Sequence, residues 1–324
     1  MPFFLPSLKK SGRLDNISIT LCIVGSRKLT EYGEDYGKMW RSFFSDITVY
    51  GFDADARACE KMNHELAVQN LSEYEEHIPF AVWKSIGQET LYLTSDPTCS
   101  SLLPPSQNYI ERFIGNSELI KVMSTTEVNT TTLDEVFGDG SRNDIDFLQM
   151  DVQGGEVNIL AGAQQILSRS ILAILTEVEF IPIYDNQPLF SDIDTALRNH
   201  GFSLFDITSL HRDYRRNGPL VSKYHPGQLV WGDAFYFRDL IRSDINQHMR
   251  TPDRIFKLAC IADGMNFTDY AMELLVYLTT RYGEDKQYNF AKNIMESLNQ
   301  VPEETKRYIL TLPVFQTIRH LASY

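Results

Sequence analysis

The stretch Asp146–Leu167, DFLQMDVQGGEVNILAGAQQIL, joins an apolar strand to a helix through an acid and two glycines. The apolar run 145–150 predicts a strand that ends at Asp151. Gly154 and Gly155 follow, and apolar residues then recur at helical spacing: Val157, Leu160, Ala161, Ile166 and Leu167. A carboxylate at the end of a buried strand is costly unless something partners it, and glycines admit a ligand against the backbone. We therefore interpret Asp151 as a candidate functional residue.

The same alternation of strand and helix extends on both sides of this stretch. The apolar runs that predict strands are residues 17–24, 47–52, 78–83, 90–94, 119–128, 145–150, 171–180, 202–207 and 228–237. The predicted helices are residues 36–44, 54–66, 133–137, a helix opened by Gly154-Gly155, and 191–199. Strands that alternate with helices indicate an α/β, doubly wound, mostly parallel sheet covered on both faces.

Beyond Arg238 the strand signal ends. Apolar residues there repeat at i, i+3, i+4 and i+7: Ala271, Leu274, Leu275, Leu278, then Ala291, Ile294, Met295 and Leu298. We expect one domain over residues 1–238 and a helical C-terminal extension over residues 239–324 that caps the fold or forms a homo-oligomer. A degenerate helical repeat is the weaker alternative, because the two stripes share no further signature.

The composition excludes several classes of function. Thirty Lys and Arg against 43 Asp and Glu give a net charge of −13, which disfavours attraction to nucleic acid backbones. The four cysteines are far apart without a CxxC pair, as is typical of a reducing compartment. No 18 apolar residues run together. We expect a cytoplasmic protein with neither a nucleic acid nor a membrane as its partner.

In an open parallel sheet the ligand lies at the carboxyl ends of the strands, so the residues that close the strands are candidates. Gly25-Ser26 follows the first strand, and the glycine would let a cofactor approach the backbone closely. Asp53 closes the second strand 28 residues later, which is longer than the usual spacing of about 20 and implies an insertion near residues 31–37. Asp53 could bind a ribose diol, cap the helix that starts near Asp55, or do both.

Five segments of the chain share a family resemblance. They are DFLQMDVQGGEVNILAGAQQIL (146–167), ILTEVEFIPIYDNQPLFSDIDTALRNHGFSLFDI (174–207), LYLTSDPTCSSLL (91–103), VYGFDADARACEKMN (49–63) and TTLDEVF (131–137). Together they cover roughly Leu21–Arg238 and closely resemble FkbM-type S-adenosylmethionine-dependent methyltransferases. The resemblance implies a class I methyltransferase-like, seven-stranded sheet, S-adenosylmethionine as the cofactor, and usually O-methylation of a hydroxyl.

The resemblance also implies roles for single residues. Gly25, with Ser26 beside it, matches the glycine turn, and Asp53 matches the ribose-binding acid. Ala81 and Val82 lie on the adenine side, and Asp151 is the cofactor-binding acid of the fourth strand. The first motif departs from the family pattern, because residues 23–29 have neither its acid nor its later glycines.

Methyl transfer to an alcohol requires a positioned acceptor and a group that removes its proton. We predict that Asp151 and Glu177 line the reaction centre as catalytic residues. Glu179, Tyr184, Ser100 and Ser101 are predicted to contact the substrate, with specificity in residues 95–118, 181–190 and 208–227. Asp151, Glu177 and Glu179 lack the tight spacing of a metal site, and we predict none.

The leading hypothesis is an O-methyltransferase that acts on a hydroxyl of a sugar-containing or polyketide-like small molecule or of a glycan. The alternative is a non-catalytic methyltransferase-fold module used for binding or assembly, as the altered first motif would favour. A nicotinamide-dependent enzyme is remote, because no G-x-G-x-x-G turn follows the first strand.

Overall fold

The computed structural model describes residues 1–26, 36–218, 220–244 and 247–323. The chain divides into two compact units, Thr20–Gly33 with Thr48–Arg238, and Met1–Ile19 with Glu34–Ile47 and Asp239–Tyr324. Residues 27–29 of the altered first motif, and residues 31–35 of the expected insertion, lie outside the described residues. The first of the two units contains the predicted site.

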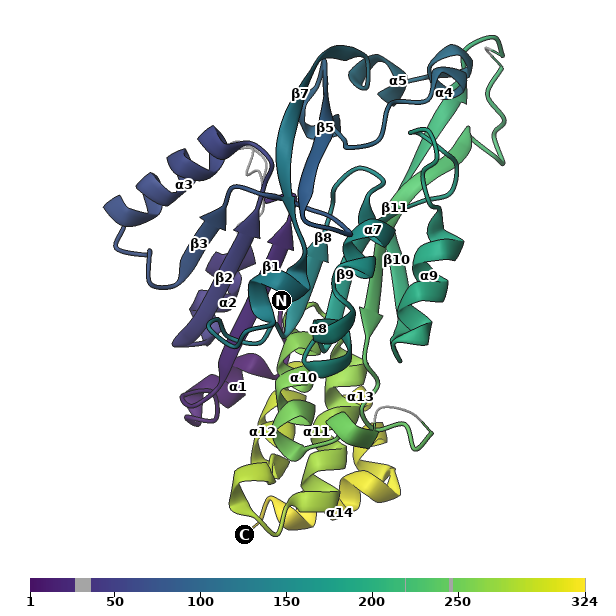
Figure 1. Cartoon of the computed structure of the whole chain (residues 1–324). Helices are drawn as coiled ribbons and strands as arrows, with labels where there is room; N and C mark the ends of the chain where they lie inside the picture. Colours follow the sequence, from purple (N-terminus) through teal and green to yellow (C-terminus); the bar gives the residue numbers. More distant parts are fainter. Residues whose placement is uncertain (27–35, 219, 245–246, 324) are drawn as a thin grey trace. The chain divides into compact units, whose positions relative to one another are not determined.

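The first unit is built on a large twisted sheet (Figure 1). Its strands follow the order β3-β2-β1-β8-β9-β11-β10-β6. Their bounds are β1 Ser18–Val24, β2 Asp46–Phe52, β3 Glu75–Ile78, β6 Phe113–Ile114, β8 Phe147–Met150, β9 Ala173–Glu179, β10 Ser203–Arg215 and β11 Gln228–Phe237. β2 pairs parallel with β3, and β8 with both β1 and β9, whereas the pairs β9–β11, β11–β10 and β10–β6 are antiparallel. The predicted class I methyltransferase-like sheet is confirmed, and the two-residue β6 extends its edge.

A second sheet has the order β4-β7-β5, with β4 Ala81–Val82, β5 Gly87–Thr94 and β7 Val122–Thr131. The apolar run 78–83, predicted as one strand, is divided between the two sheets. Pro79 follows the last residue of β3, and a proline offers no N–H to continue a strand ladder. The single predicted strand is therefore wrong, because the chain changes sheets there.

Two segments predicted to carry specificity contain regular structure. Residues 95–118 include η1 Pro97–Cys99, α4 Gln107–Arg112, β6 and α5 Asn116–Leu119. β10 continues to Arg215, well beyond the predicted end at Ile207. The first part of the segment 208–227 is therefore strand, because the polar residues of β10 pair with β11.

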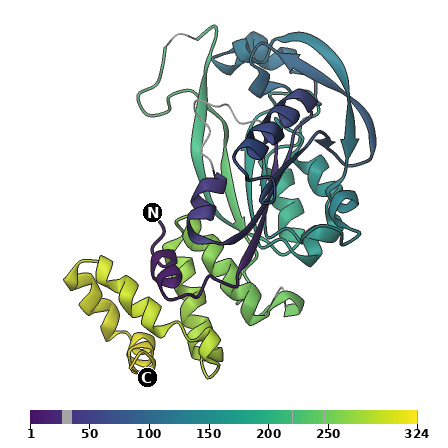
Figure 2. The ribbon, with the colours of Figure 1, turned by 90° about the vertical axis from the view of Figure 1, so that its left-hand side faces the viewer.

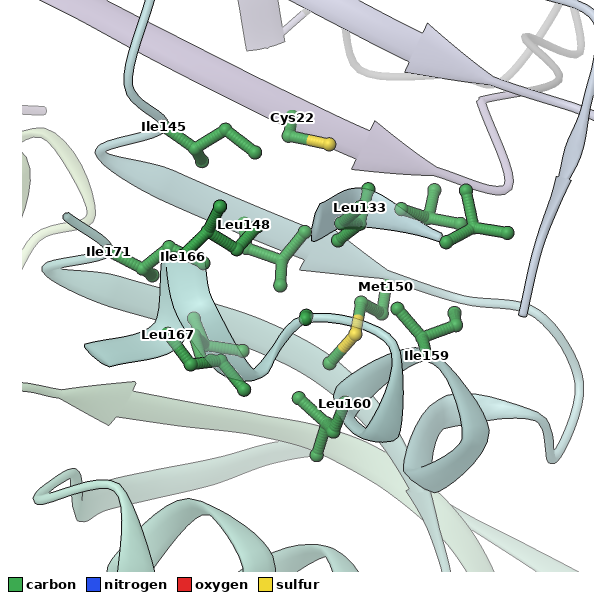
Figure 3. Packing of buried hydrophobic residues seen from close by; sticks show 14 of the residues in the cluster. Cys22, Leu133, Ile145, Leu148, Met150, Ile159, Leu160, Ile166, Leu167 and Ile171 are labelled. Carbon is green, nitrogen blue, oxygen red and sulfur yellow. The ribbon is translucent and has the colours of Figure 1, made fainter. Parts of the chain in front are cut away.

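The helices of this unit are α3 Ala56–Val68, α6 Leu133–Phe137, α7 Glu156–Ala161, α8 Gln164–Arg169 and α9 Phe190–Asn199. Thr132 caps α6 as predicted, by accepting the N–H of Glu135. The single helix predicted after Gly155 is instead two, α7 and α8. Both pack on one face of the sheet, where Ile159, Leu160, Ile166 and Leu167 surround Leu148 and Met150 of β8 (Figure 3).

The second unit is helical (Figure 2). Its α-helices are α1 Leu5–Lys10, α2 Tyr36–Phe43, α10 Pro252–Gly264, α11 Thr268–Tyr282, α12 Ala291–Ser297, α13 Glu303–Thr311 and α14 Pro313–Leu321, and its 3-10 turns are η2 Gln247–Met249, η3 Lys286–Tyr288 and η4 Leu298–Gln300. The helical character predicted for residues 239–324 is confirmed. Residues 1–19 and 34–47, predicted with the sheet domain, belong to this unit instead. No helix within the described ranges combines the length and the apolar character that crossing a bilayer takes.

Candidate active site

A cavity of about 770 Å³ opens at the carboxyl ends of β1, β2 and β8. Seven of the predicted site residues line it: Gly25, Asp53, Ala81, Val82, Ser100, Ser101 and Asp151. They come from segments more than 100 residues apart in the chain, and the parallel sheet brings them to one edge. The strand-end acids Asp53 and Asp151 therefore share a single cavity, as the sequence predicts.

Gly25 lies where β1 and β8 approach most closely. Its φ is +84°, and a Cβ there would stand 2.0 Å from the backbone oxygen of Asp151. The N–H of Asp151 in turn donates to the oxygen of Val24 at 3.1 Å. The position therefore needs glycine to let the two strand ends approach, in addition to any ligand that binds there.

Ser26 does not line the cavity with the other predicted cofactor residues. Its buried hydroxyl lies 3.0 Å from Nδ1 of His77, and Nε2 of His77 lies 3.0 Å from Oε1 of Glu75. The hydroxyl of Ser26 thus contacts His77 of β3. Its predicted contact with cofactor remains a prediction without support from this geometry.

The two interpretations of Asp53 are separated by the structure. Asp55 caps α3, because its Oδ1 accepts the N–H of Arg57 at 3.0 Å and of Ala58 at 3.1 Å. Asp53 lines the cavity, and its Oδ1 accepts the N–H of Asp55 at 2.8 Å. This bond holds the carboxylate at the end of β2, in the position expected of a ribose-binding acid.

The sequence predicts only some of the residues that form the rest of the cavity wall. Next to the predicted Ala81 and Val82, the apolar rings of Phe80 and Trp83 line one side of the cavity. The other side is formed by β5, β7 and η1, with the residues Leu91, Leu93, Thr98, Thr126, Glu127 and Val128. The alternating polar and apolar residues of β5 predicted a strand, but single-strand patterns do not reveal which strand pairs with which.

Gln153 is the functional candidate that sequence reasoning missed. Its side-chain nitrogen donates to Oδ1 of Asp151 and to Oε2 of Glu177, both at 2.8 Å. Its side-chain oxygen lies 3.1 Å from the hydroxyl of Tyr184, and its backbone oxygen accepts from Oγ of Ser101 at 2.8 Å. Its φ of +59° is uncommon for a residue with a Cβ. The side chain and backbone of this one residue thus hold together two predicted catalytic carboxylates and two predicted substrate residues.

Three predicted residues stand behind the cavity wall rather than in it. Glu177, Glu179 and Tyr184 are absent from the lining. Glu177 and Glu179 are two residues apart in β9 and so share one face of the sheet. Tyr184 is buried and donates to the backbone oxygen of Cys99 at 2.7 Å. Contact of these side chains with a substrate remains a prediction.

Several carboxylates lie close together in this region, and none of the hydrogen bonds given above joins them to a basic side chain. Burial raises the pKa of Asp151, and the Asp233 carboxylate raises it further. Burial and then the charge of Asp151 hold the pKa of Glu177 well above its usual range. Burial likewise raises the pKa of Glu179, and neither of its oxygens has a hydrogen-bond partner among the described residues. Burial is also the main reason that the pKa of Glu156 is raised to about 7.

This crowding is an electrostatic cost that a positive ligand would relieve, because each carboxylate disfavours the ionised form of its neighbours. Among the described residues, no group of three His, Cys, Asp or Glu side chains is arranged to hold a metal ion.

A family model described as the methyltransferase FkbM domain matches residues 40–204. The chain belongs to the FkbM methyltransferase family. The family predicted from the sequence motifs is therefore confirmed. Among curated proteins, none matches the chain.

Several solved structures are similar in fold to this FkbM family member. The FkbM methyltransferase of Methylobacillus flagellatus is 12% identical with a TM-score of 0.39; the match covers 73% of this chain and 48% of that protein, about half its length. The Bacillus cereus O-methyltransferase, solved with S-adenosylhomocysteine, is 12% identical over 73% of this chain and 81% of that one, with a TM-score of 0.32. TrmK of M. capricolum, also solved with S-adenosylhomocysteine, is 10% identical over 100% and 97%, with a TM-score of 0.32.

Proposed function

We propose that this FkbM-family chain transfers a methyl group from S-adenosylmethionine to a hydroxyl of an uncharged small molecule or glycan, such as a sugar-containing or polyketide-like compound. The observation that carries the proposal is the cavity where Gly25, Asp53 and Asp151 meet. The cavity lies at the strand ends, where open α/β sheets bind nucleotide-like ligands.

The residues present fit the proposed cofactor. Asp53 is placed to accept hydrogen bonds from a ribose diol, and Ala81, Val82 and Trp83 offer an apolar surface to a base. Among the described residues, the charged side chains of the lining are four acids, Asp53, Asp55, Glu127 and Asp151, against Arg57. This excess of negative charge favours a ligand that carries a sulfonium and an ammonium group.

The same lining supports the proposed class of acceptor. Thr98, Ser100 and Thr126 line the cavity together with the apolar residues Leu91 and Val128. Such a lining suits hydroxyl-bearing or apolar molecules, because among the described residues a phosphate would meet four acids and the one cation Arg57. A nucleic acid acceptor is disfavoured for the same reason.

When bound, S-adenosylmethionine would supply the methyl group. The part of this chain is to position the acceptor and to take up its proton. Asp151 faces the cavity, and Gln153 fixes its carboxylate through the 2.8 Å bond to Oδ1. Its raised pKa makes the carboxylate of Asp151 a better proton acceptor than an aspartate of ordinary pKa. Glu177, held by the same amide, would keep Asp151 oriented from behind.

We also place this reaction in the cytoplasm. The four cysteines of the chain are all free: Cys22, Cys59, Cys99 and Cys260. Thiols are kept in this state in reducing compartments, which supports the proposed location.

Calorimetric titration with S-adenosylhomocysteine tests the proposed function. We expect binding by the wild-type chain and a Kd raised about 10- to 100-fold by Asp53→Ala, since a hydrogen bond to a charged group contributes about 1.5–3 kcal/mol. Asp53→Asn retains an acceptor for the N–H of Asp55 and so separates ligand binding from folding. Asp139→Ala, an exposed acid that does not line the cavity, is the matched control. Absence of any binding heat at saturating ligand would leave the non-catalytic alternative in place.

A further inference from the structure

The connection between β10 and β11 exposes apolar side chains at one end of the sheet unit. Leu220 is 96% exposed, Val221 56% and Tyr224 84%. Singly exposed apolar residues are common on soluble proteins, but three on one short connection are unusual. None of them lines the cavity or belongs to the hydrophobic cores described for this unit.

The end of β10 and this connection together have a charge opposite to that of the chain. Between His211 and Gly227 the basic residues are Arg212, Arg215, Arg216 and Lys223, whereas Asp213 is the single acid. Asp213 is buried, where it accepts the hydroxyl of Tyr109 and lies 3.1 Å from Nε2 of His211. A basic segment thus stands out on a chain whose net charge is −13.

Neighbouring elements extend the exposed apolar area. β6 pairs with β10 so that Ile114 lies opposite Tyr214, and both are exposed. Leu119 of α5 and Val122 and Met123 of β7 are exposed as well. Both views place α5 and the β10–β11 connection at the same end of the sheet unit (Figures 1 and 2). We define the distal surface as this set: Ile114, Leu119, Val122, Met123, Arg212, Tyr214, Arg215, Leu220, Val221, Lys223 and Tyr224.

We propose that the distal surface binds an anionic phospholipid bilayer. Exposed Leu, Val and Tyr side chains enter the boundary between headgroups and acyl chains, while Arg and Lys bind the phosphates beside them. The pairing of apolar and basic residues favours this partner over nucleic acid, which would gain little from Leu220 and Val221. The inference departs from the expectation of no membrane partner, which rested on whole-chain composition.

The distal surface is connected directly to the wall of the cavity. The hydroxyl of Ser95 donates to the backbone oxygens of Glu118 and Leu119, both at 2.8 Å, and the N–H of Asp96 donates to Leu119 at 3.0 Å. Pro97 and Thr98, the next residues, line the cavity. The distal surface and this part of the cavity lining are therefore joined through Ser95 and Asp96.

Co-sedimentation of the full chain with vesicles tests this inference independently of catalysis. We expect the chain to pellet with vesicles of equal parts phosphatidylcholine and phosphatidylglycerol, and not with phosphatidylcholine alone. Added salt should weaken the binding, because it screens the cationic contribution.

Two sets of variants identify the surface. Leu220→Ser combined with Val221→Ser and Tyr224→Ser should lower vesicle affinity at least about tenfold. Arg212→Gln with Lys223→Gln should lower it mainly at low salt. The matched control is Ile86→Ser with Tyr308→Ser, which are 63% and 68% exposed and lie outside the distal surface. All of these side chains are exposed, so thermal unfolding should be unchanged and confirms folding.

Four results would overturn the inference. The first is failure of the wild-type chain to pellet with anionic vesicles at low salt. The second is equal pelleting by the Leu220, Val221 and Tyr224 variant. The third is binding of an RNA oligonucleotide, in place of vesicles, that depends on Arg212 and Lys223. The fourth is a concentration-dependent dimer abolished by the apolar substitutions, which would assign the surface to a second copy.

Discussion

Each unit of the chain contains a buried acid, and the two acids differ in the hydrogen bonding of their carboxylate oxygens. Asp263 of α10 is fully buried, and its carboxylate accepts the backbone N–H groups of Phe3 at 2.9 Å and of Phe4 and Leu5 at 2.8 Å. Glu179 of β9 is equally buried, but neither of its oxygens has a hydrogen-bond partner among the described residues. Buried carboxylates are tolerated when their lone pairs are filled. The first acid therefore stabilises a fold, and the second is a candidate for serving a ligand.

The surroundings of the two acids sharpen this contrast. Burial raises the pKa of Asp263, while its three N–H donors act in the opposite direction. Around Glu179, the charges of Glu156 and Asp151 add to the effect of burial, while the side chain of Gln187 acts in the opposite direction. A cation bound nearby would offset the repulsion between these carboxylates.

The largest expected effect is that of Asp263→Ala on folding. The substitution leaves three N–H groups at the start of α1 without their acceptor, so we expect the free energy of unfolding to fall by about 4 kcal/mol. Denaturant unfolding measures it. Asp263→Asn, which can still accept but carries no charge, should give a smaller loss. A loss below about 1 kcal/mol for the alanine variant would show that the three bonds are not structural.

The sheet and its strand-end acids could be predicted because each depends on local pattern. The apolar run before Asp151 and the glycines after it place the acid at a strand end whatever the rest of the chain does. Asp53 was recognised in the same way. Periodicity also gave the helical character of residues 239–324, since the stripe through Leu274 and Leu278 is buried as expected.

Features that depend on distant parts of the chain could not be predicted. The N-terminal residues join the helical unit through Asp263, which lies about 260 positions later. Gln153 looks like an ordinary loop residue until the fold brings Glu177 and Tyr184 to its two ends. The wall of β5 and β7 likewise depends on strand pairing, which one-strand patterns leave open.

The next largest effect is expected for Gln153→Glu, which replaces the amide donor by a third carboxylate beside Asp151 and Glu177. At about pH 8, where more of the three carboxyl groups ionise, we expect a loss of about 3 kcal/mol of folding free energy. The loss should shrink near about pH 5, because protonation restores a donor. Denaturant unfolding at both pH values measures the difference. An equal loss at the two pH values would show that geometry, and not charge, requires the glutamine.

A smaller effect is expected from Glu156 as the pH changes. Its pKa is raised from 4.5 to about 7 in the folded chain, so its contribution to stability is complete below the unfolded value and is lost as the pH rises through about 7. Without ligand, the thermal unfolding temperature should therefore fall between about pH 5 and pH 8, by the equivalent of about 2 kcal/mol. Glu156→Gln should flatten this dependence, while its amide oxygen can still accept the N–H of Val152. A profile as steep in the variant as in the wild type would contradict the assignment.

The smallest effect is expected for Glu179→Gln. This substitution tests the contrast between Asp263 and Glu179 most directly. Removing a carboxylate that has no hydrogen-bond partner among the described residues should leave folding unchanged or stabilise it by about 1 kcal/mol. The gain is small because burial favours the neutral form of this side chain. Asp263→Asn is an equally conservative change at an equally buried acid. We expect it to lower the free energy of unfolding, whereas Glu179→Gln should leave this free energy unchanged or raise it. Paired denaturant unfolding of the two variants decides this: if both lose stability to the same extent, Glu179 has a structural partner, and its burial is no evidence of a role toward a ligand.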